Sequence, residues 1–357
     1  MRRTPRAIVL LLVAALPLTA CAAAESRGAD DERPGSDTVL TWETTGGEAT
    51  EKEKHSFQDP YTEKTGVRFE NVSSPSAVNQ IQTMVETGNV LWDVTHKGSH
   101  IAARYCGELF EKLDFETVPE DIYPDGSTSD CARPLQKYGT AFAYDNEVYT
   151  DKVPTKIEDF FDVDTFPGKR VVYGSNPRGV FEAALVADGV EPEDLYPLDV
   201  DRAIAKLDTI KDDMIFAPTL TALQQNIVDK QATMTLSLTG RLGTIYDSGG
   251  TITPVWDYTS WDFDALLVPL GSKNKDEAAK AIEFALQPEQ IIRYAETNGG
   301  TPAREDIELS SIEYSDTHRI FNPFLNEDKG RMGLLDPVWW AENIGSASEA
   351  YVSWQVG

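Results

Sequence analysis

The chain has 357 residues, with 32 Lys and Arg against 59 Asp and Glu, which gives a formal net charge of −27 at pH 7. This acidic balance argues against nucleic acid as a partner, and against binding to anionic membranes through basic patches, because both need a basic surface. A hydrophobic content of 41% and an aromatic content of 10% indicate a folded protein, and the length suits two domains.

The N-terminus has the features of an export signal. Three arginines in the first six residues precede an apolar run over residues 7–16. This run is too short to span a membrane and is typical of a signal peptide, here residues 1–20. Small residues before Cys21 resemble a lipobox, in which that cysteine is acylated after cleavage. We therefore expect a lipid anchor at Cys21 and a flexible tether over residues 21–37.

Two further cysteines, Cys106 and Cys131, follow. In an exported protein they can form a disulfide that closes a loop of about 25 residues, and the alternative is two buried thiols. Neither lies in a CxxC motif, so redox and zinc chemistry have no support.

Strand-like and helix-like hydrophobic patterns alternate along the rest of the chain. Capping residues support the two last helices, since Asn274 precedes one, and Pro288 and Gly299 bound the other. This alternation predicts two α/β lobes with mainly parallel sheets. Strands are predicted over residues 38–44, 67–72, 92–95, 141–144, 169–173, 232–238 and 263–270, and helices over 76–86, 179–187, 200–210, 222–228, 276–286 and 288–299.

Motifs for catalysis or cofactor binding are weak. The chain has no Gly-rich phosphate loop, no GxSxG and no HExxH. An SxxK pattern begins at Ser272 in a polar turn, without the partner motifs of serine acylases, and it is the one feature that would suit a surface enzyme. His96 and His100 are four residues apart, but Gly98 between them favours a loop, so we expect no metal site and no cofactor.

With these features in view, the chain resembles the extracytoplasmic solute-binding lipoproteins of ABC importers, in the branch that includes spermidine/putrescine-binding proteins. The resemblance is spread over most of the mature chain, and the order and spacing of its motifs carry it. The motifs are AYDNEVY at residues 143–149, FPGKR at 166–170, ADGV at 187–190, LYPLDVDRA at 195–203, FALQPE at 284–289 and WWAEN at 339–343.

The resemblance implies a type II, two-lobed periplasmic-binding-protein-like fold, with hinge crossovers between the lobes. It places lobe 1 at residues 38–142 and 263–312, and lobe 2 at residues 143–262 and 313–357. It also implies a monomeric receptor on the outer face of the bacterial cytoplasmic membrane, which closes on a small solute and delivers it to the ABC permease without catalysis.

Candidate ligand contacts follow from the family pattern and from the carboxyl ends of the predicted strands. Trp42 with Glu43, and Asp264, suit an ammonium group through a cation–π contact and charge-assisted hydrogen bonds. The further candidates are Gly98, His100, Ser237, Thr239, Tyr258, Trp261, Asp262 and Thr301.

Departures from the family pattern bear on the ligand. Family aromatics are replaced by hydroxyl residues around Ser237 and Thr239, while Arg241 is retained. We expect a small, cationic, amine-bearing solute that is polyamine-like or more polar. The alternatives are a neutral or anionic solute held by Arg241 and the hydroxyls, or a surface or sensory lipoprotein outside import.

Overall fold

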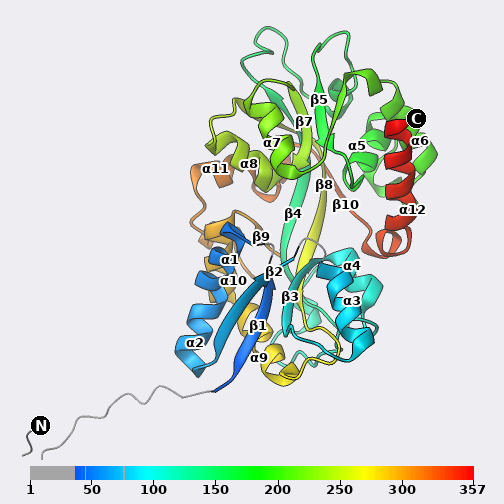
Figure 1. Ribbon diagram of the computed structural model, residues 1–357. Helices are drawn as coiled ribbons and strands as arrows, with labels where there is room; N and C mark the ends of the chain where they lie inside the picture. The colour runs from blue at the N-terminus through cyan, green and yellow to red at the C-terminus, as the bar shows by residue number, and fades with distance from the viewer. Residues whose placement is uncertain (1–36, 45, 75–76) are drawn as a thin grey trace, which may run out of the picture.

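The computed structural model of the protein describes residues 37–44, 46–74 and 77–357. The predicted signal peptide, the predicted acylation site Cys21 and nearly all of the predicted tether lie outside these residues. The described chain folds into two α/β lobes, one above the other in Figure 1, which confirms the predicted fold class. Within the described part of the chain, no helix has both the length and the apolar character that a membrane span requires.

The first lobe, lower in Figure 1, is built on a sheet in which β1 pairs in parallel with β2 and β3. Its core packs Leu40 and Trp42 of β1 against Phe57 and Ile282. Its strands are β1 (Val39–Thr44), β2 (Arg68–Ser73) and β3 (Val94–Gly98), and its helices are α1 (Glu48–Glu53), the π-helix η1 (Lys54–Gln58), α2 (Asp59–Thr65), α3 (Ala77–Thr87), α4 (Ser99–Tyr105), α9 (Lys275–Ala285) and α10 (Pro288–Asn298).

The second lobe repeats this design around parallel pairs of β5 with β6 and β7. Helix α5 is apolar except for Glu182 and wholly buried, because it packs within the lobe and not on its surface. The strands are β5 (Arg170–Tyr173), β6 (Met214–Ala217) and β7 (Met234–Leu238), and the helices are α5 (Val180–Ala187), α6 (Val200–Asp208), α7 (Leu220–Val228), α8 (Thr239–Asp247) and α12 (Pro337–Val356).

Two long strands, β4 (Pro134–Asp145) and β8 (Ile252–Leu267), run through both lobes (Figure 1). They pair antiparallel along their length and join the strands of both lobes into one sheet, which has ten strands in the described residues. Eight of these strands follow the order β2-β1-β3-β8-β4-β7-β5-β6. Two shorter strands pair at its sides, β9 (Thr301–Pro302) with β4 and β10 (Arg331–Leu334) with β8, and α11 (Asp316–Phe321) precedes β10. Short 3-10 helices lie at Glu120–Ile122, Ile157–Phe160, Pro192–Asp194, Lys211–Asp213, Leu309–Ser311, Pro323–Leu325 and Glu327–Lys329.

The crossing strand β8 corrects the sequence-based prediction. A strand was expected only from residue 263, but β8 begins at Ile252, so the sheets are parallel within each lobe and antiparallel where β4 and β8 enter them. Pro254 and the acidic residues after it gave this segment the composition of a loop. Asp264, expected at the start of a strand, therefore lies near the end of a long one.

The buried cores group by lobe. One set of clusters draws on residues 40–135 and 265–314, and another on residues 141–258 and 321–351. Tyr314 still packs in the core of the first lobe, and Phe321 already packs in the second. We propose that the lobes divide within β4 and β8, and again between Tyr314 and Phe321.

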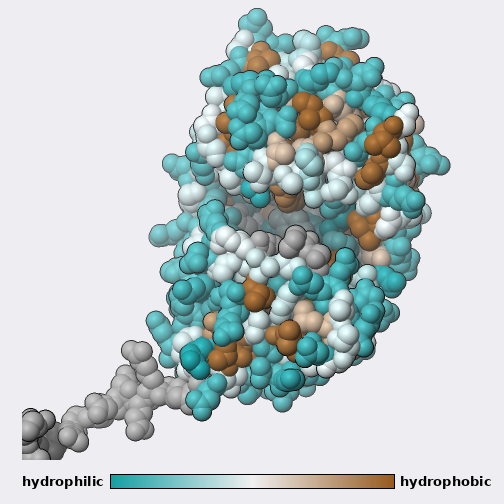
Figure 2. All heavy atoms as spheres, in the orientation of Figure 1, coloured by the Kyte–Doolittle hydropathy of each residue, from teal (hydrophilic) through white to brown (hydrophobic). Residues whose placement is uncertain are grey.

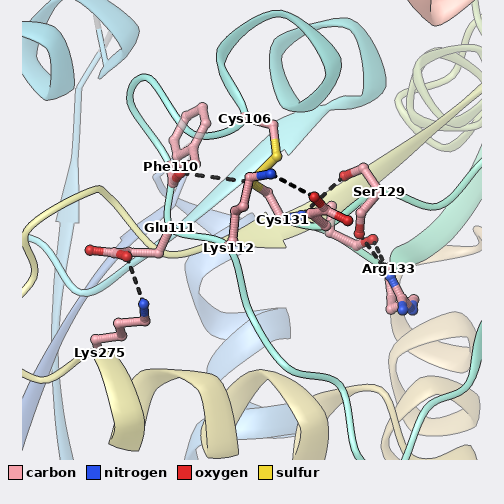
Figure 3. Close-up of a disulfide and its surroundings, with 10 residues drawn as sticks. Cys106, Phe110, Glu111, Lys112, Ser129, Cys131, Arg133 and Lys275 are labelled. Carbon is pink, nitrogen blue, oxygen red and sulfur yellow. Dashed lines mark hydrogen bonds and ion pairs between the residues drawn. A yellow bond between two sulfur atoms is a disulfide. The ribbon is translucent and has the colours of Figure 1, made fainter.

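A disulfide joins Cys106, directly after α4, to Cys131 in the loop before β4 (Figure 3). Its Cα atoms are 5.6 Å apart, and Cys131 is fully buried. The bond ties the loop between the two residues to the first lobe. Nearby, Lys275 and Glu111 form an ion pair that holds the start of α9 against the same loop.

Candidate functional site

A cleft with a volume of about 800 Å³ lies between the lobes, where Figure 2 shows a hollow. This volume is within the range of small-molecule sites. Both lobes and both crossing strands supply its walls. The polar and charged residues among them include Glu48, Lys52, Glu53, His96, Lys97, Gln136, Lys137, Tyr138, Asn176, Arg178, Ser237, Thr239, Arg241, Asp262, Asp264 and Asn298.

The wall of the first lobe is centred on His96, a residue of β3. Its Nδ1 lies 2.9 Å from Glu53 Oε1 at the end of α1, and its Nε2 lies 3.0 Å from Asp264 Oδ2 on β8. Burial alone would lower the pKa of His96, but the charges and hydrogen bonds of Asp264 and Glu53 outweigh burial and raise it to about 10. His96 is therefore an imidazolium between two carboxylates.

Both carboxylates have a further partner that fixes their position. Glu53 Oε2 accepts a hydrogen bond from Trp42 Nε1 at 2.7 Å, and Asp264 Oδ2 accepts one from Gln136 Nε2 at 3.0 Å. The other oxygen of Asp264, Oδ1, is buried and has no hydrogen-bond partner among the described residues. Asp264, a residue of the cleft wall, thus has one acceptor oxygen without a protein partner.

At the crossing strands, Asp262 is a hub for the two lobes. Its carboxylate accepts hydrogen bonds from Ser99 of α4, from Tyr138 of β4 at 2.8 Å, and from Arg178 of the second lobe. The Asp262 side chain is 1% exposed and that of Arg178 is 8% exposed. The guanidinium also lies over the ring of Trp340, 5.8 Å from its centroid.

A tight turn aims Arg178 at this hub. Gly179 follows it with φ of 80°, a left-handed conformation that favours glycine, and helix α5 begins at the next residue. Glu182, in the first turn of α5, accepts the backbone N–H of Gly179 at 2.7 Å. A Cβ on Gly179 would lie 2.9 Å from Thr140 of β4, so the turn also needs glycine for its close approach to the crossing strand.

The wall of the second lobe is formed where β7 passes into α8. Ser237 and Thr239 lie at this junction, and the buried Ser237 hydroxyl has no hydrogen-bond partner among the described residues. Arg241 extends the wall and forms no ion pair within the described chain, and the same holds for Lys137 of β4. The ammonium of Lys137 lies over the ring of Phe324, at 4.7 Å from its centroid.

The ion pairs leave the cleft with spare positive charge. Each carboxylate in its described walls already has a protein cation as partner: Glu48 has Lys52, Asp262 has Arg178, and both Glu53 and Asp264 have His96. Arg241 and Lys137 have no such partner. The cleft therefore combines two unpaired cations with one carboxylate oxygen that has no protein donor.

Five of the predicted ligand contacts lie in the walls of the cleft: Gly98, Ser237, Thr239, Asp262 and Asp264. Gly98 and Ser237 lie near the inner ends of β3 and β7, and Thr239 begins α8. Asp262 and Asp264 lie where β8 crosses between the lobes. Asp262 lines the cleft, but its oxygens are already taken by protein donors.

The prediction for Trp42 is corrected by the structure. Its side chain is 0% exposed and packs between Phe57 and Phe69, with ring centroids 6.5 and 5.7 Å away. No face of the ring is open to a ligand, so a cation–π contact is excluded. Glu43 is likewise buried, and its carboxylate accepts hydrogen bonds from Thr95 and Lys97.

Four other predicted contacts also lie outside the walls of the cleft. Tyr258 is 2% exposed in the core of the second lobe, and Trp261 packs edge-on against Phe324. Thr301 is buried, where its hydroxyl bonds to Asn322. His100 lies in α4, beside the cleft residue Gly98.

Several cleft residues were missed by the sequence analysis. His96 was considered only as a metal ligand paired with His100, but its partners are Glu53 and Asp264, which are distant in sequence. Arg178 could have been found from the sequence, because it directly precedes Gly179 at the start of a predicted helix. A charged residue in such a turn is a candidate for a functional role. For Tyr138 and Gln136 the sequence contains no such signal beyond their position in a strand.

Metal and covalent chemistry find no support in the described residues. These residues contain no group of three or more His, Cys, Asp or Glu side chains placed to hold a metal ion. Ser272, the residue of the SxxK pattern, donates a hydrogen bond to Asp93 at 2.6 Å and accepts one from the backbone of Asn274. That is the behaviour of a turn serine.

The chain matches known proteins over most of its length. Residues 57–322 match the family described as bacterial extracellular solute-binding protein. Over 280 residues the chain is 30% identical to the gamma-aminobutyric acid-binding protein of Pseudomonas aeruginosa, which covers 74% of this chain and 78% of that protein.

Solved structures agree with this match. The structure of a GABA receptor is 29% identical, with a TM-score of 0.79 over 89% of this chain and 98% of that one. A spermidine/putrescine substrate-binding protein of Streptococcus pneumoniae is 16% identical, with a TM-score of 0.67 over 90% of this chain and 99% of that one. The second likeness shows the fold alone.

Proposed function

This chain belongs to the family of bacterial extracellular solute-binding proteins, and we propose that its solute is a small amino acid of the γ-aminobutyrate type. Proteins of this kind are solute receptors of ABC transporters and not enzymes. The proposed solute carries one ammonium group and one carboxylate, whereas a polyamine has only positive groups and a simple anion only negative ones.

The balance of paired and unpaired charges in the cleft carries this proposal. A polyamine has only positive groups and needs a free carboxylate at each end, because an unpaired buried ammonium is costly. Here the cleft carboxylates already have cationic partners, whereas Arg241 and Lys137 have none. A ligand carboxylate would supply the missing negative charge.

The amino end of the ligand has a matching site on the opposite wall. Asp264 Oδ1 is a buried acceptor without a partner among the described residues, and a ligand ammonium would satisfy it. An ω-amino acid fits both requirements, with its ammonium on the first lobe and its carboxylate toward Arg241 and the hydroxyls of Ser237 and Thr239. The names of two relatives, a GABA-binding protein and a GABA receptor, agree with this choice.

Such a ligand would also drive closure of the lobes. Its two ends contact different lobes, so it binds the closed form more strongly than the open form, and this difference in affinity is the only source of the conformational change. We further propose that acylation of Cys21 holds the receptor near its permease, which raises its effective concentration there. The sequence around Cys21 supports this anchor.

Calorimetric titration of the mature protein with four compounds of the same chain length tests the proposal. γ-Aminobutyrate carries one positive and one negative charge, and butyrate carries only the negative charge. Butylamine carries one positive charge, and 1,4-diaminobutane carries two. We expect γ-aminobutyrate to bind at least about tenfold more tightly than each of the others, because each lacks one paired end. Tightest binding of 1,4-diaminobutane would contradict the proposal, and tightest binding of butyrate would favour an anion receptor.

A further inference from the structure

His96 has an arrangement that a purely structural histidine does not need. Both of its ring nitrogens face carboxylates, at 2.9 Å from Glu53 and 3.0 Å from Asp264, and its side chain is only 10% exposed. The three groups come from α1, β3 and β8, and all three line the cleft. They meet at the wall where the ligand's amino end is proposed to bind.

Counting charges shows what the imidazole does at this wall. Two ionised carboxylates carry two negative charges, and a protonated His96 cancels one of them. The group of three then carries one net negative charge and one acceptor without a protein donor, Asp264 Oδ1. Without His96, the same two carboxylates would face the cleft with two negative charges and free oxygens on both.

We propose that His96 is a specificity-determining residue that restricts the amino end of the ligand to a single ammonium group. The imidazolium of His96 occupies the position that a second ammonium group of the ligand would take. The inference rests on the proposed function and adds to it the residue that excludes doubly charged amino ends. Trp42 and Gln136 support this role, since their hydrogen bonds hold Glu53 and Asp264 in position around the ring.

The test, run at about pH 5.5, compares γ-aminobutyrate with 3,4-diaminobutyrate. At this pH both neighbouring amines of the second compound are protonated, so it has the same carboxylate and a second ammonium next to the first. Calorimetry gives the ratio of the two dissociation constants for each protein. In His96→Gln the ratio should shift by at least about tenfold toward the diamine, because a unit charge a few ångströms away changes binding of a further charge by this order. In His96→Lys, which keeps the positive charge, the ratio should stay close to the wild-type value.

His100→Gln is the matched control. Burial and the nearby charge of Arg178 lower the pKa of His100 to about 3, so its replacement removes an imidazole but no charge at the pH of the test. His100 also lies outside the walls of the cleft. The ratio of dissociation constants should therefore remain at the wild-type value.

The outcomes separate this inference from the proposed function. If His96→Gln binds both compounds with the wild-type ratio, or if His96→Lys shifts the ratio as His96→Gln does, the inference is wrong although the receptor still binds amino acids. If the wild-type protein binds neither compound, the proposed function itself fails. If His96→Gln does not fold, Glu53→Gln decides: it removes a negative charge, so the ratio should move at least about tenfold away from the diamine, and an unchanged ratio refutes the inference.

Discussion

Replacing Asp262 by asparagine should destabilise the protein severely. Its carboxylate accepts hydrogen bonds from Ser99 and from Tyr138, and pairs with Arg178, while both members of the ion pair are almost fully buried. Asparagine keeps one acceptor oxygen and the shape, but it leaves the guanidinium without a counter-charge. Breaking a buried pair from one side costs about 3–5 kcal/mol, and we expect the free energy of unfolding to fall by this amount.

A double-mutant cycle separates the ion pair from its surroundings. Arg178→Met removes the cation but leaves Asp262 with its donors Ser99 and Tyr138, so it should cost less, about 1–3 kcal/mol. In the double variant the guanidinium is no longer stranded, and the combined loss should be at least about 2 kcal/mol smaller than the sum of the single losses. Urea unfolding followed by circular dichroism measures all four proteins.

An exposed pair on the second lobe serves as the control. Arg202 and Asp188 lie 2.7 Å apart, but their side chains are 43% and 38% exposed. The corresponding cycle should give a coupling of only about 0–1 kcal/mol. If the losses at Asp262 and Arg178 were additive, or if Asp262→Asn were as mild as Asp188→Asn, the account of a buried interlobe hub would be refuted.

Three further predictions concern other parts of the molecule. Replacing both Cys106 and Cys131 by serine should lower the free energy of unfolding by about 3 kcal/mol in urea titrations, because the disulfide closes a 25-residue separation, and an unchanged midpoint would contradict this. The pKa of His96 is raised in the folded state to about 10, so its contribution to stability is complete below its unfolded pKa of about 6.5 and is lost as the pH rises through about 10. The difference in unfolding free energy between wild type and His96→Gln should therefore shrink between pH 6 and pH 10, and a constant difference would show that His96 is not protonated. Arg241→Gln should weaken γ-aminobutyrate binding by at least about tenfold in calorimetry without lowering the melting temperature, since Arg241 has no ion-pair partner in the described chain, while Arg202→Gln should leave the affinity unchanged.

The fold was largely predictable because its signals are local. Hydrophobic periods and capping residues marked six of the twelve α-helices in the described chain, and α9 and α10 begin and end within one residue of the predicted bounds. The part of β8 before residue 263 was missed because its hydrophobic pattern is broken by Pro254 and acidic residues, and its pairing with β4 joins residues more than a hundred positions apart. Pairing of that kind leaves no local pattern in the sequence.

The site was only partly predictable, for a related reason. Strand ends indicated where Ser237 and Thr239 would lie, and the family pattern indicated Asp264 at the start of a predicted strand. All three residues line the cleft. The neighbouring sequence does not show whether a tryptophan ring faces a ligand or the core. The ring of Trp42 lies on the side of β1 that packs into the core. The partners of His96 come from two other elements, so its charge and its role depend on tertiary structure.

A crystal structure of the mature protein with γ-aminobutyrate tests the central claim most directly. The account predicts closed lobes, with the ligand ammonium within hydrogen-bonding distance of Asp264 Oδ1 and the ligand carboxylate at the guanidinium of Arg241. A ligand bound in the reverse direction, or bound outside the space between the lobes, would contradict it.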